Sequence, residues 1–126
     1  MPSSSTPTAG GQRYPRSSRL RKRADFLRVQ RSGARRKLRH TVVCLTVRTE
    51  AEPCPARFGL TVSRKVGPAV VRNRVKRRLR EAIRRHRGLL SGVDVVFIAL
   101  PSAARASYAA LCTDVLRGLD FARRVA

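Results

Sequence analysis

Acidic residues are scarce in this chain. Seven Asp and Glu stand against 29 Lys and Arg in 126 residues, which gives a formal net charge of +22 at pH 7. The carboxylates are scattered along the sequence, whereas a two-metal nuclease needs several of them to converge on its ions. The only histidines, His40 and His86, are isolated, and neither a P-loop motif nor an HExxH zinc motif is present. The chain is therefore a poor candidate for an enzyme that acts alone.

Cysteines and long apolar runs are also rare. Cys44, Cys54 and Cys112 are odd in number and unequally spaced, which fits neither a zinc site nor a disulfide framework, so we expect reduced thiols. No segment approaches the roughly 20 apolar residues of a membrane span, and residues 1–18 lack the apolar core of a signal peptide. These absences predict a cytoplasmic protein that does not associate with a membrane.

The surplus of positive charge repels itself in a compact chain unless an anionic partner offsets it. Hydrophobic residues make up 42% of the chain, which is more than a disordered basic tail contains and enough for the core of one small domain. Residues 1–18 are rich in Pro, Ser, Thr and Gly, so they predict a disordered N-terminal arm. Residues 19–126 then form a single folded domain, and its expected partner is nucleic acid.

Hydrophobic periodicity predicts three strands. Residues 41–47 are β-branched and apolar, residues 57–63 alternate with a period of two, and residues 93–100 form an apolar run typical of a central strand buried on both faces. On the second strand, Phe58, Leu60 and Val62 point toward one face, which we assign to the core. The opposite face carries only small residues and is either simply exposed to solvent or open to close approach by another chain. Its members, including those of the first strand, are Gly59, Thr61, Ser63, Val42, Cys44 and Thr46.

Two helices are expected outside the most basic region. Apolar residues predict a short helix over residues 23–31, which Ser32 and Gly33 end. A second helix follows Ser107, whose hydroxyl can cap it. Its predicted apolar face consists of Tyr108, Leu111, Cys112, Val115, Leu116 and Leu119. With the basic helix described next, the order of elements predicts an α/β two-layer sandwich, also classed as α+β.

The strongest helical pattern follows Gly67 and Pro68. Apolar residues recur there at helical spacing from Val71 to Ile83, while basic residues fill the rest of the surface and Glu81 is the only acid. A charged helix face is usually just solvated. Such faces commonly mix signs so that neighbours attract, whereas here like charges repeat. The pattern therefore favours a helix that binds nucleic acid.

The stretch SRKVGPAVVRNRVKRRLREAIR, residues 63–84, resembles the signature of the bacterial ribonuclease P protein subunit, with Arg72, Asn73 and Arg74 as its Arg-Asn-Arg core. The likeness extends to the strand FGLTVS, the early helix RADFLRVQRSG, and the strand DVVFIAL with its following helix, over about residues 19–120. The resemblance implies an αβββαβα fold like ribosomal protein S5 domain 2. It also implies a left-handed βαβ crossover, although such crossovers are right-handed in nearly all proteins.

The resemblance further implies the protein subunit of the ribonuclease P ribonucleoprotein. Such a subunit binds the catalytic RNA, as an expected 1:1 heterodimer, and helps it remove the 5′ leader from precursor tRNA. Mg²⁺ ions held mainly by the RNA then perform the hydrolysis. The protein alone is expected to carry no catalytic residue, metal or cofactor.

Two RNA-binding surfaces follow from the resemblance. The motif helix and its preceding loop face the RNA subunit, through Arg64, Lys65, Arg72, Asn73, Arg74, Lys76, Arg77 and Arg80. The cleft between the first helix and the small-residue sheet face holds the single-stranded leader, through Phe26, Val42, Cys44, Thr61 and Ser63. Small residues admit the leader backbone, and an aromatic ring can stack on a base.

The sequence departs from the family pattern at two positions. Gln30 and Cys44 stand where family members commonly carry aromatics, so we expect weaker stacking in the cleft and a larger share of phosphate contacts. Residues 1–18 and the Arg-rich residues 33–40 lie outside the core motif and receive no role from the resemblance.

Two other hypotheses remain open at this point. A ribosomal protein or RNA chaperone also needs only shape and phosphate contacts with structured RNA. A sequence-specific DNA-binding protein would place the basic helix in a major groove. Preference for leader-bearing precursor over mature tRNA would separate a ribonuclease P subunit from a ribosomal protein, which has no reason to discriminate between them. Footprints on duplex DNA that survive physiological salt would identify a DNA-binding protein.

Overall fold

The computed structural model describes residues 23–24, 29, 33–47, 55–88 and 90–125. Along the chain its elements are β1 (Ala34–Lys37), β2 (Thr41–Val47), β3 (Arg57–Thr61), α2 (Ala69–His86), β4 (Val93–Ala99), the 3₁₀ helix η2 (Pro101–Arg105) and α3 (Tyr108–Val125). Arg23, Ala24 and Val29 are helical, as predicted for the first helix. The predicted arm over residues 1–18, Phe26 and Gln30 lie outside the described residues.

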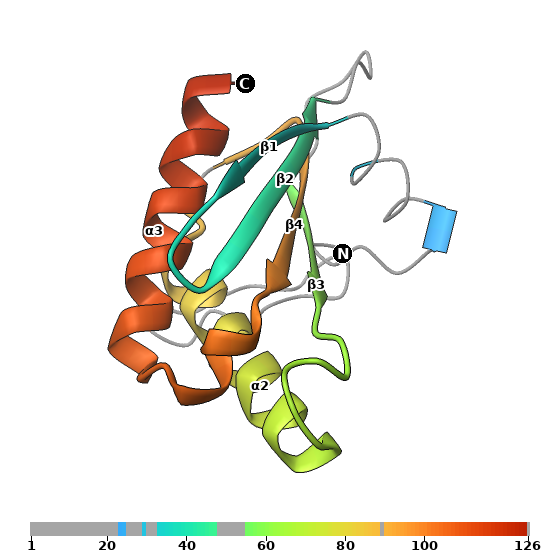
Figure 1. The fold of residues 1–126 in the computed structure, drawn as a ribbon. Helices are drawn as coiled ribbons and strands as arrows, with labels where there is room; N and C mark the ends of the chain where they lie inside the picture. Colours follow the sequence, from blue (N-terminus) through green and yellow to red (C-terminus); the bar gives the residue numbers. More distant parts are fainter. Residues whose placement is uncertain (1–22, 25–28, 30–32, 48–54, 89, 126) are drawn as a thin grey trace, which may run out of the picture.

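The four strands form one sheet in the order β1-β2-β4-β3. β2 pairs antiparallel with β1 and β4, whereas β3 pairs parallel with β4. Because α2 joins the two parallel strands, β3, α2 and β4 form a βαβ unit (Figure 1). These elements confirm the α/β class and the order βββαβα. The handedness of the crossover and the likeness to domain 2 of ribosomal protein S5 remain predictions.

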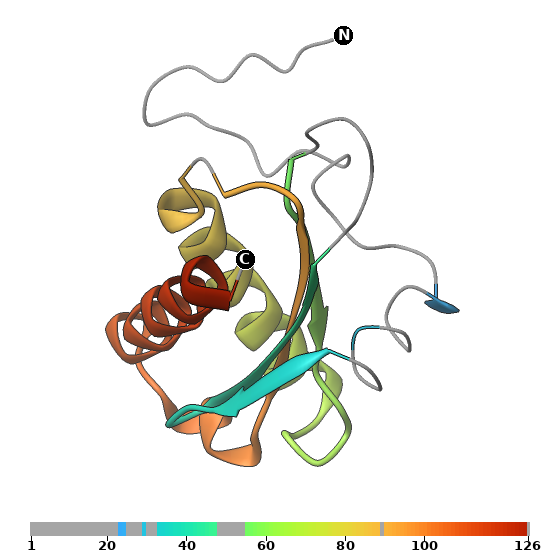
Figure 2. The same cartoon turned by 90° about the horizontal axis from the view of Figure 1, so that it is seen from above.

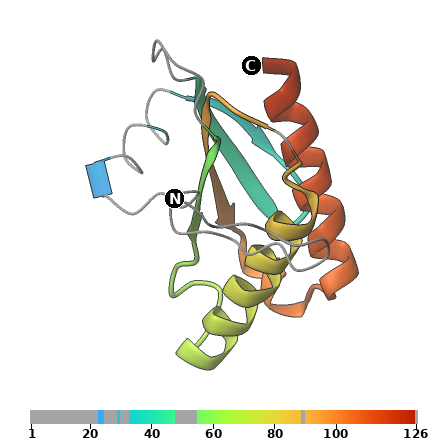
Figure 3. The same ribbon diagram turned by 180° about the vertical axis from the view of Figure 1, so that it is seen from behind.

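The molecule has two layers. Viewed along the sheet, α2 and α3 lie on one side, and the segment with Arg23 and Ala24 lies on the other (Figure 2). From behind, α2 and α3 lie next to each other across that face of the sheet (Figure 3). β4 is an interior strand whose residues are nearly all buried, which confirms the prediction of a central strand.

The main core lies between the sheet and the two helices. The sheet contributes a face that includes Phe58 and Phe97, with Leu60 packed against it, and Val62 just beyond β3 belongs to the same cluster, as predicted. α2 and α3 contribute apolar stripes that repeat at helical spacing. The fully buried members of these stripes are Val75, Leu79, Ala82, Ile83, Leu111, Val115, Leu119 and Ala122.

Two predictions about these elements need correction. The strand expected over residues 57–63 ends at Thr61, before a turn. Leu116 is 46% exposed, because the buried face of α3 instead includes Gly118 and Ala122. Gly33, predicted to end the first helix with Ser32, is not helical, and its φ is not positive. Its backbone lies against the carbonyls of Val29 and Leu45, where a Cβ would approach within 2.6 Å.

β1 was not predicted, and the reason is physical. All four of its residues, ARRK, are exposed, so no apolar alternation marks the strand. β1 forms at the edge of the sheet because β2 offers it a partner, with Ala34 opposite Leu45 and Lys37 opposite Val42. Its basic side chains also suit an edge strand, since charge there discourages pairing with other chains.

A buried carboxylate fastens the turn after β1 to α3. Asp114 is 1% exposed and accepts hydrogen bonds from the backbone N–H of His40 at 2.7 Å and from the Thr41 hydroxyl at 3.0 Å. At the start of the same helix, the Ser107 hydroxyl accepts a hydrogen bond from the Ala110 N–H at 3.1 Å, as predicted for a cap. The turn is thus held at a fixed position along α3.

At Gly118, α3 lies close against the sheet. A Cβ at this position would meet the Phe97 ring at 2.5 Å, and Phe97 is fully buried at the centre of the sheet. Gly118→Ala should gain about 1 kcal/mol of helix propensity but lose about 1 to 3 kcal/mol to overpacking. We expect a lower free energy of unfolding in urea titrations.

The matched test is Gly118→Ala in a Phe97→Leu background. The smaller side chain removes the clash, so the double variant should lose less than the sum of the two single effects. Strict additivity would show that the two positions do not interact.

Candidate nucleic-acid interface

The charged face of α2 is set by burial of its opposite side. Val75, Leu79 and Ile83 are fully buried, which fixes how the helix is rotated about its axis. Asn73, Arg77 and Arg80 are therefore exposed, and Lys76 is half-buried on the flank. No acidic residue occupies the first turn, and Glu81 is the only acid on the helix. The predicted basic surface exists as a continuous face of one rigid element.

The loop before α2 extends this face. Two backbone hydrogen bonds close it, from Val66 N–H to Ser63 O and from Gly67 N–H to Arg64 O. Arg64 and Lys65 are exposed at its tip. They lie beside the N-terminus of α2, whose unpaired N–H groups also favour negative charge. Both residues occupy the surface predicted for them.

Some arginines of α2 also donate hydrogen bonds to backbone carbonyls. Arg72 Nε donates to Gly67 O at 3.1 Å. One Arg74 Nη donates to Ala104 O at 3.2 Å, and one Arg78 Nη donates to Ala106 O at 2.9 Å. Arg74 and Arg78 therefore hold η2 and the start of α3 against α2. Arg72 and Arg74, predicted only as RNA-facing residues, therefore also contribute to the fold, and a sequence pattern does not reveal bonds to such carbonyls.

Glu81 is neutralised within α2. Its carboxylate accepts hydrogen bonds from Arg84 and from Arg85, the latter at 2.9 Å. These bonds lower the pKa of Glu81 to about 2, and the bond from Arg84 has the largest effect. The only acid on the helix is thus paired with cations near the C-terminal end, and it leaves the face with Asn73 and Arg77 positive.

The face of the sheet opposite the main core contains most of the predicted cleft residues. Strand register places Cys44, Val96 and Gly59 in one row and Val42, Ile98 and Thr61 in the next, and directly opposite residues share a face. Val42, Thr61 and Ile98 are half-buried, and Ser63 is exposed just beyond β3. Phe26 lies outside the described residues, so its predicted position in the cleft is untested.

Cys44 lies beneath this surface rather than on it. It is fully buried together with Val29 and Val96, with Val42 and Ile98 packed around them. Burial raises the pKa of its thiol, while Arg35 acts in the opposite direction. Cys44 therefore helps the first helix pack onto the sheet, and the accessible part of the predicted cleft consists of the neighbouring row.

Three basic residues on this face were missed by the sequence prediction. Register places Arg35 opposite Cys44 and Lys37 opposite Val42, so the exposed side chains of β1 border the open face. On the other side, Arg57 forms two hydrogen bonds of 2.8 Å with Asp94, which is fully buried. This pairing explains why an acid interrupts the apolar run of β4. Arg35 and Lys37 had no signal in the sequence because β1 was not predicted, whereas the period of two on the predicted strand places Arg57 on the same face as Gly59 and Thr61.

The chain and its fold have relatives among known proteins. The family model described as Ribonuclease P matches residues 14–123. The chain belongs to the ribonuclease P protein family. It is similar to the ribonuclease P protein component of Gluconacetobacter diazotrophicus, at 44% identity over 82% of this chain and 90% of that protein. The corresponding protein of a Nocardioides species is 47% identical over 80% of this chain and 87% of the relative.

Solved structures of the family share the fold. A ribonuclease P protein of Staphylococcus aureus has a TM-score of 0.69 and 28% identity, covering 87% of this chain and 95% of that one. The ribonuclease P protein of Thermotoga maritima has a TM-score of 0.71 and 31% identity, covering 80% and 96%. Family membership makes the chain a ribonuclease P protein component. Such a component is part of the holoenzyme that processes tRNA, in which it works with the ribonuclease P RNA.

The contacts of α2 predict two classes of arginine. Arg74→Ala and Arg78→Ala should each lower the free energy of unfolding by about 1 to 2 kcal/mol, because each removes a charge-assisted hydrogen bond to a carbonyl. Arg77→Ala and Arg80→Ala are the matched controls, and their exposed side chains should change stability by less than about 0.5 kcal/mol. Urea titrations of the four variants measure this. Equal stability of all four would contradict the division.

Glu81 gives a pH-dependent prediction. Its folded-state pKa of about 2 lies below the ordinary value, so its contribution to stability is complete above about pH 4.5 and is lost as pH falls toward 2. The side chain is 39% exposed, which limits the effect to the range of surface pairs, below about 1 kcal/mol. The stability difference between wild type and Glu81→Gln should shrink as pH falls from 7 to 2. A constant difference would contradict the pairing.

Proposed function

We propose that the chain binds the catalytic RNA subunit of ribonuclease P through α2 and its preceding loop, and the 5′ leader of precursor tRNA through the open sheet face. Together with the RNA it forms a 1:1 complex in the cytoplasm that removes the leader to give the mature 5′ end. The observation that carries this proposal is the exposed face of α2, on which like charges repeat without carboxylate partners.

Phosphate groups suit this face because they remove its self-repulsion. Arg64, Lys65, Asn73, Arg77 and Arg80 are exposed on the loop and helix, where they can donate to phosphate oxygens. Guanidinium groups bind such oxygens in pairs, which adds orientation to the attraction. Because α2 is fixed by its buried stripe, little backbone ordering opposes binding there.

The leader surface combines small residues with cations. Val42, Thr61 and Ile98 form a half-buried row that a nucleotide backbone can approach, and Lys37 ends that row at the edge of β1. Phosphate contacts are independent of base identity, so this arrangement suits leaders of different sequence. We assign the role of stacking on a base to Phe26, which lies outside the described residues.

We assign the hydrolysis to Mg²⁺ ions held mainly by the RNA. Within the described residues, no group of three or more His, Cys, Asp or Glu side chains could hold a metal ion. The four described carboxylates are also engaged with protein donors, at Glu81, Asp94, Asp114 and Asp120.

Among the described residues, none of the helices has the length and apolar character of a membrane span.

The test is cleavage of precursor tRNA by the cognate RNA subunit at low Mg²⁺, with and without the protein. We expect cleavage at the leader junction only when the protein is added, and tighter binding of precursor than of mature tRNA by the complex. The protein alone should not cleave.

A different result would favour another role. If the protein binds the RNA subunit but changes neither cleavage nor precursor preference, a general structured-RNA-binding protein or RNA chaperone becomes the better description. Multiple-turnover cleavage by protein free of RNA would overturn the assignment of chemistry to the RNA.

A further inference from the structure

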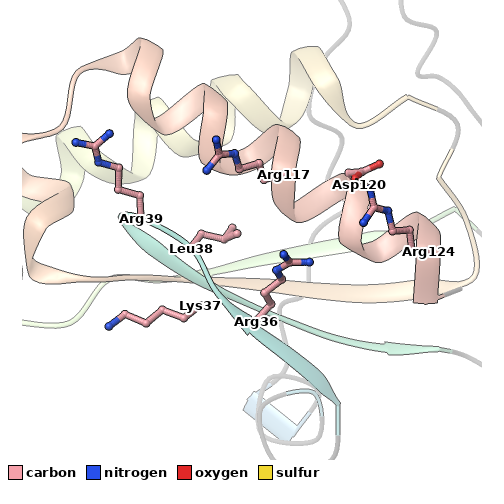
Figure 4. Close-up of a pocket in the computed structure, with 7 residues that line it drawn as sticks. All are labelled: Arg36, Lys37, Leu38, Arg39, Arg117, Asp120 and Arg124. Carbon is pink, nitrogen blue, oxygen red and sulfur yellow. Dashed lines mark ion pairs between the residues drawn. The ribbon is translucent and has the colours of Figure 1, made fainter.

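A basic hollow lies between the β1–β2 turn and α3. Its volume is about 490 Å³, and it is lined by Arg36, Lys37, Leu38, Arg39, Arg117, Asp120 and Arg124. Figure 4 shows Arg36 and Leu38 extending from the chain toward α3, which contributes Arg117, Asp120 and Arg124 from the other side. The Arg-rich residues 33–40, which received no role from the sequence, thus form one wall of a defined concave surface.

The charge of this hollow is almost entirely unbalanced. Its single carboxylate, Asp120, is paired with Arg124 at 2.9 Å. The remaining cations have no carboxylate within ion-pair distance among the described residues. Those on the α3 side of the sheet are Arg36, Arg39 and Arg117, whereas the Lys37 side chain points away from α3, toward the open sheet face (Figure 4). Three like charges around one concavity repel one another, and an anion bound there relieves that repulsion.

The backbone that carries these cations is held in place. Leu38 N–H donates to Thr41 O at 2.8 Å, and Leu100 N–H donates to His40 O at 2.9 Å. The buried carboxylate of Asp114 binds the same turn from α3. The position of Arg39 relative to Arg117 is therefore set by hydrogen bonds and not by a free loop, so binding needs little ordering of the backbone.

The lining favours phosphates over bases. Among the described residues, no aromatic side chain lines the hollow. The nearby Phe121 ring has the Arg36 guanidinium 5.7 Å from its centroid, so a cation already occupies one of its faces. Proteins that hold single strands combine basic grooves with exposed aromatic platforms, whereas contacts to a helical RNA backbone need only well-placed donors.

This hollow is separate from the interface on α2. β1 and β3 are opposite edges of the sheet, and the loop of residues 63–68 follows β3. With strands about 4.8 Å apart, the two edges are separated by about 14 Å of sheet. Phosphates that contact Arg64 and Lys65 therefore differ from those that reach Arg39 and Arg117.

We propose that the hollow between β1 and α3 is a second RNA-binding site, which holds the phosphate backbone of a helical segment of the RNA subunit. This inference rests on the proposed function, because the RNA subunit is its source of phosphates. The protein then contacts the RNA from two edges of its sheet, with the leader surface between them.

The test measures binding of the RNA subunit to the full chain over a range of salt concentrations. The variant is Arg39→Gln combined with Arg117→Gln, since glutamine keeps much of the aliphatic stem. We expect affinity to fall about tenfold or more, and the slope of log affinity against log salt to decrease by about 2, one for each lost phosphate contact. Preference for precursor over mature tRNA should be unchanged.

The matched control is Arg105→Gln combined with Arg123→Gln. Both residues are exposed and lie outside the hollow and outside the set assigned to the α2 interface, so the net charge falls by the same amount. If the control pair reduces affinity and slope as much as the test pair does, the hollow has no specific role and only net charge matters. Thermal melting of each variant without RNA verifies that both remain folded.

The failure of this inference differs from failure of the proposed function. If wild-type protein restores low-Mg²⁺ cleavage and the Arg39/Arg117 variant behaves as the control does, only the second site is wrong. If wild-type protein does not bind the RNA subunit at all, both are wrong.

Discussion

The packing of one apolar stripe of α2 in the core is the contact on which the proposed RNA-binding face of this helix depends. Val75, Leu79 and Ile83 are fully buried, and this burial determines where every other side chain of the helix points. Asn73, Arg77 and Arg80 then face outward together. A helix with the same charges and no such stripe would have no fixed face, because isolated helices with many like charges are unstable in water.

The rest of the molecule keeps this arrangement in place with few acidic residues. Two of its buried carboxylates serve the fold: Asp94 pairs with Arg57 on β3, and Asp114 holds the turn before β2. Glu81 and Asp120 instead pair with arginines on their own helices. The unpaired positive charge is thereby left to surfaces where an anionic partner can reach it. A fold with so little internal compensation is suited to a protein that works in complex with RNA, as membership of the ribonuclease P protein family indicates.

Much of the fold could be predicted from the sequence because burial leaves periodic patterns. β2 was predicted with its observed bounds, and α2 and β4 were predicted to within a residue or so at their starts. The missing element, β1, has no buried side chain and exists because β2 offers it hydrogen-bond partners. The site was predicted less completely for a related reason. Exposure of Arg77 and Arg80 follows from helix geometry, whereas the bonds of Arg74 and Arg78 depend on where η2 lies in three dimensions. The burial of Cys44 likewise depends on Val29 from a separate element.

The most direct measurement is cross-linking from the outward face of α2 in the reconstituted holoenzyme. A single cysteine at Arg77, introduced after the native cysteines are replaced, would carry a short photoreactive group, and one at Thr113 on the exposed side of α3 would serve as the control. The account predicts cross-links from position 77 to the RNA subunit at one or a few nucleotides, and much weaker ones from position 113. Equal labelling from both positions, or none from position 77 in an active complex, would contradict the claim that this face of α2 binds the RNA subunit.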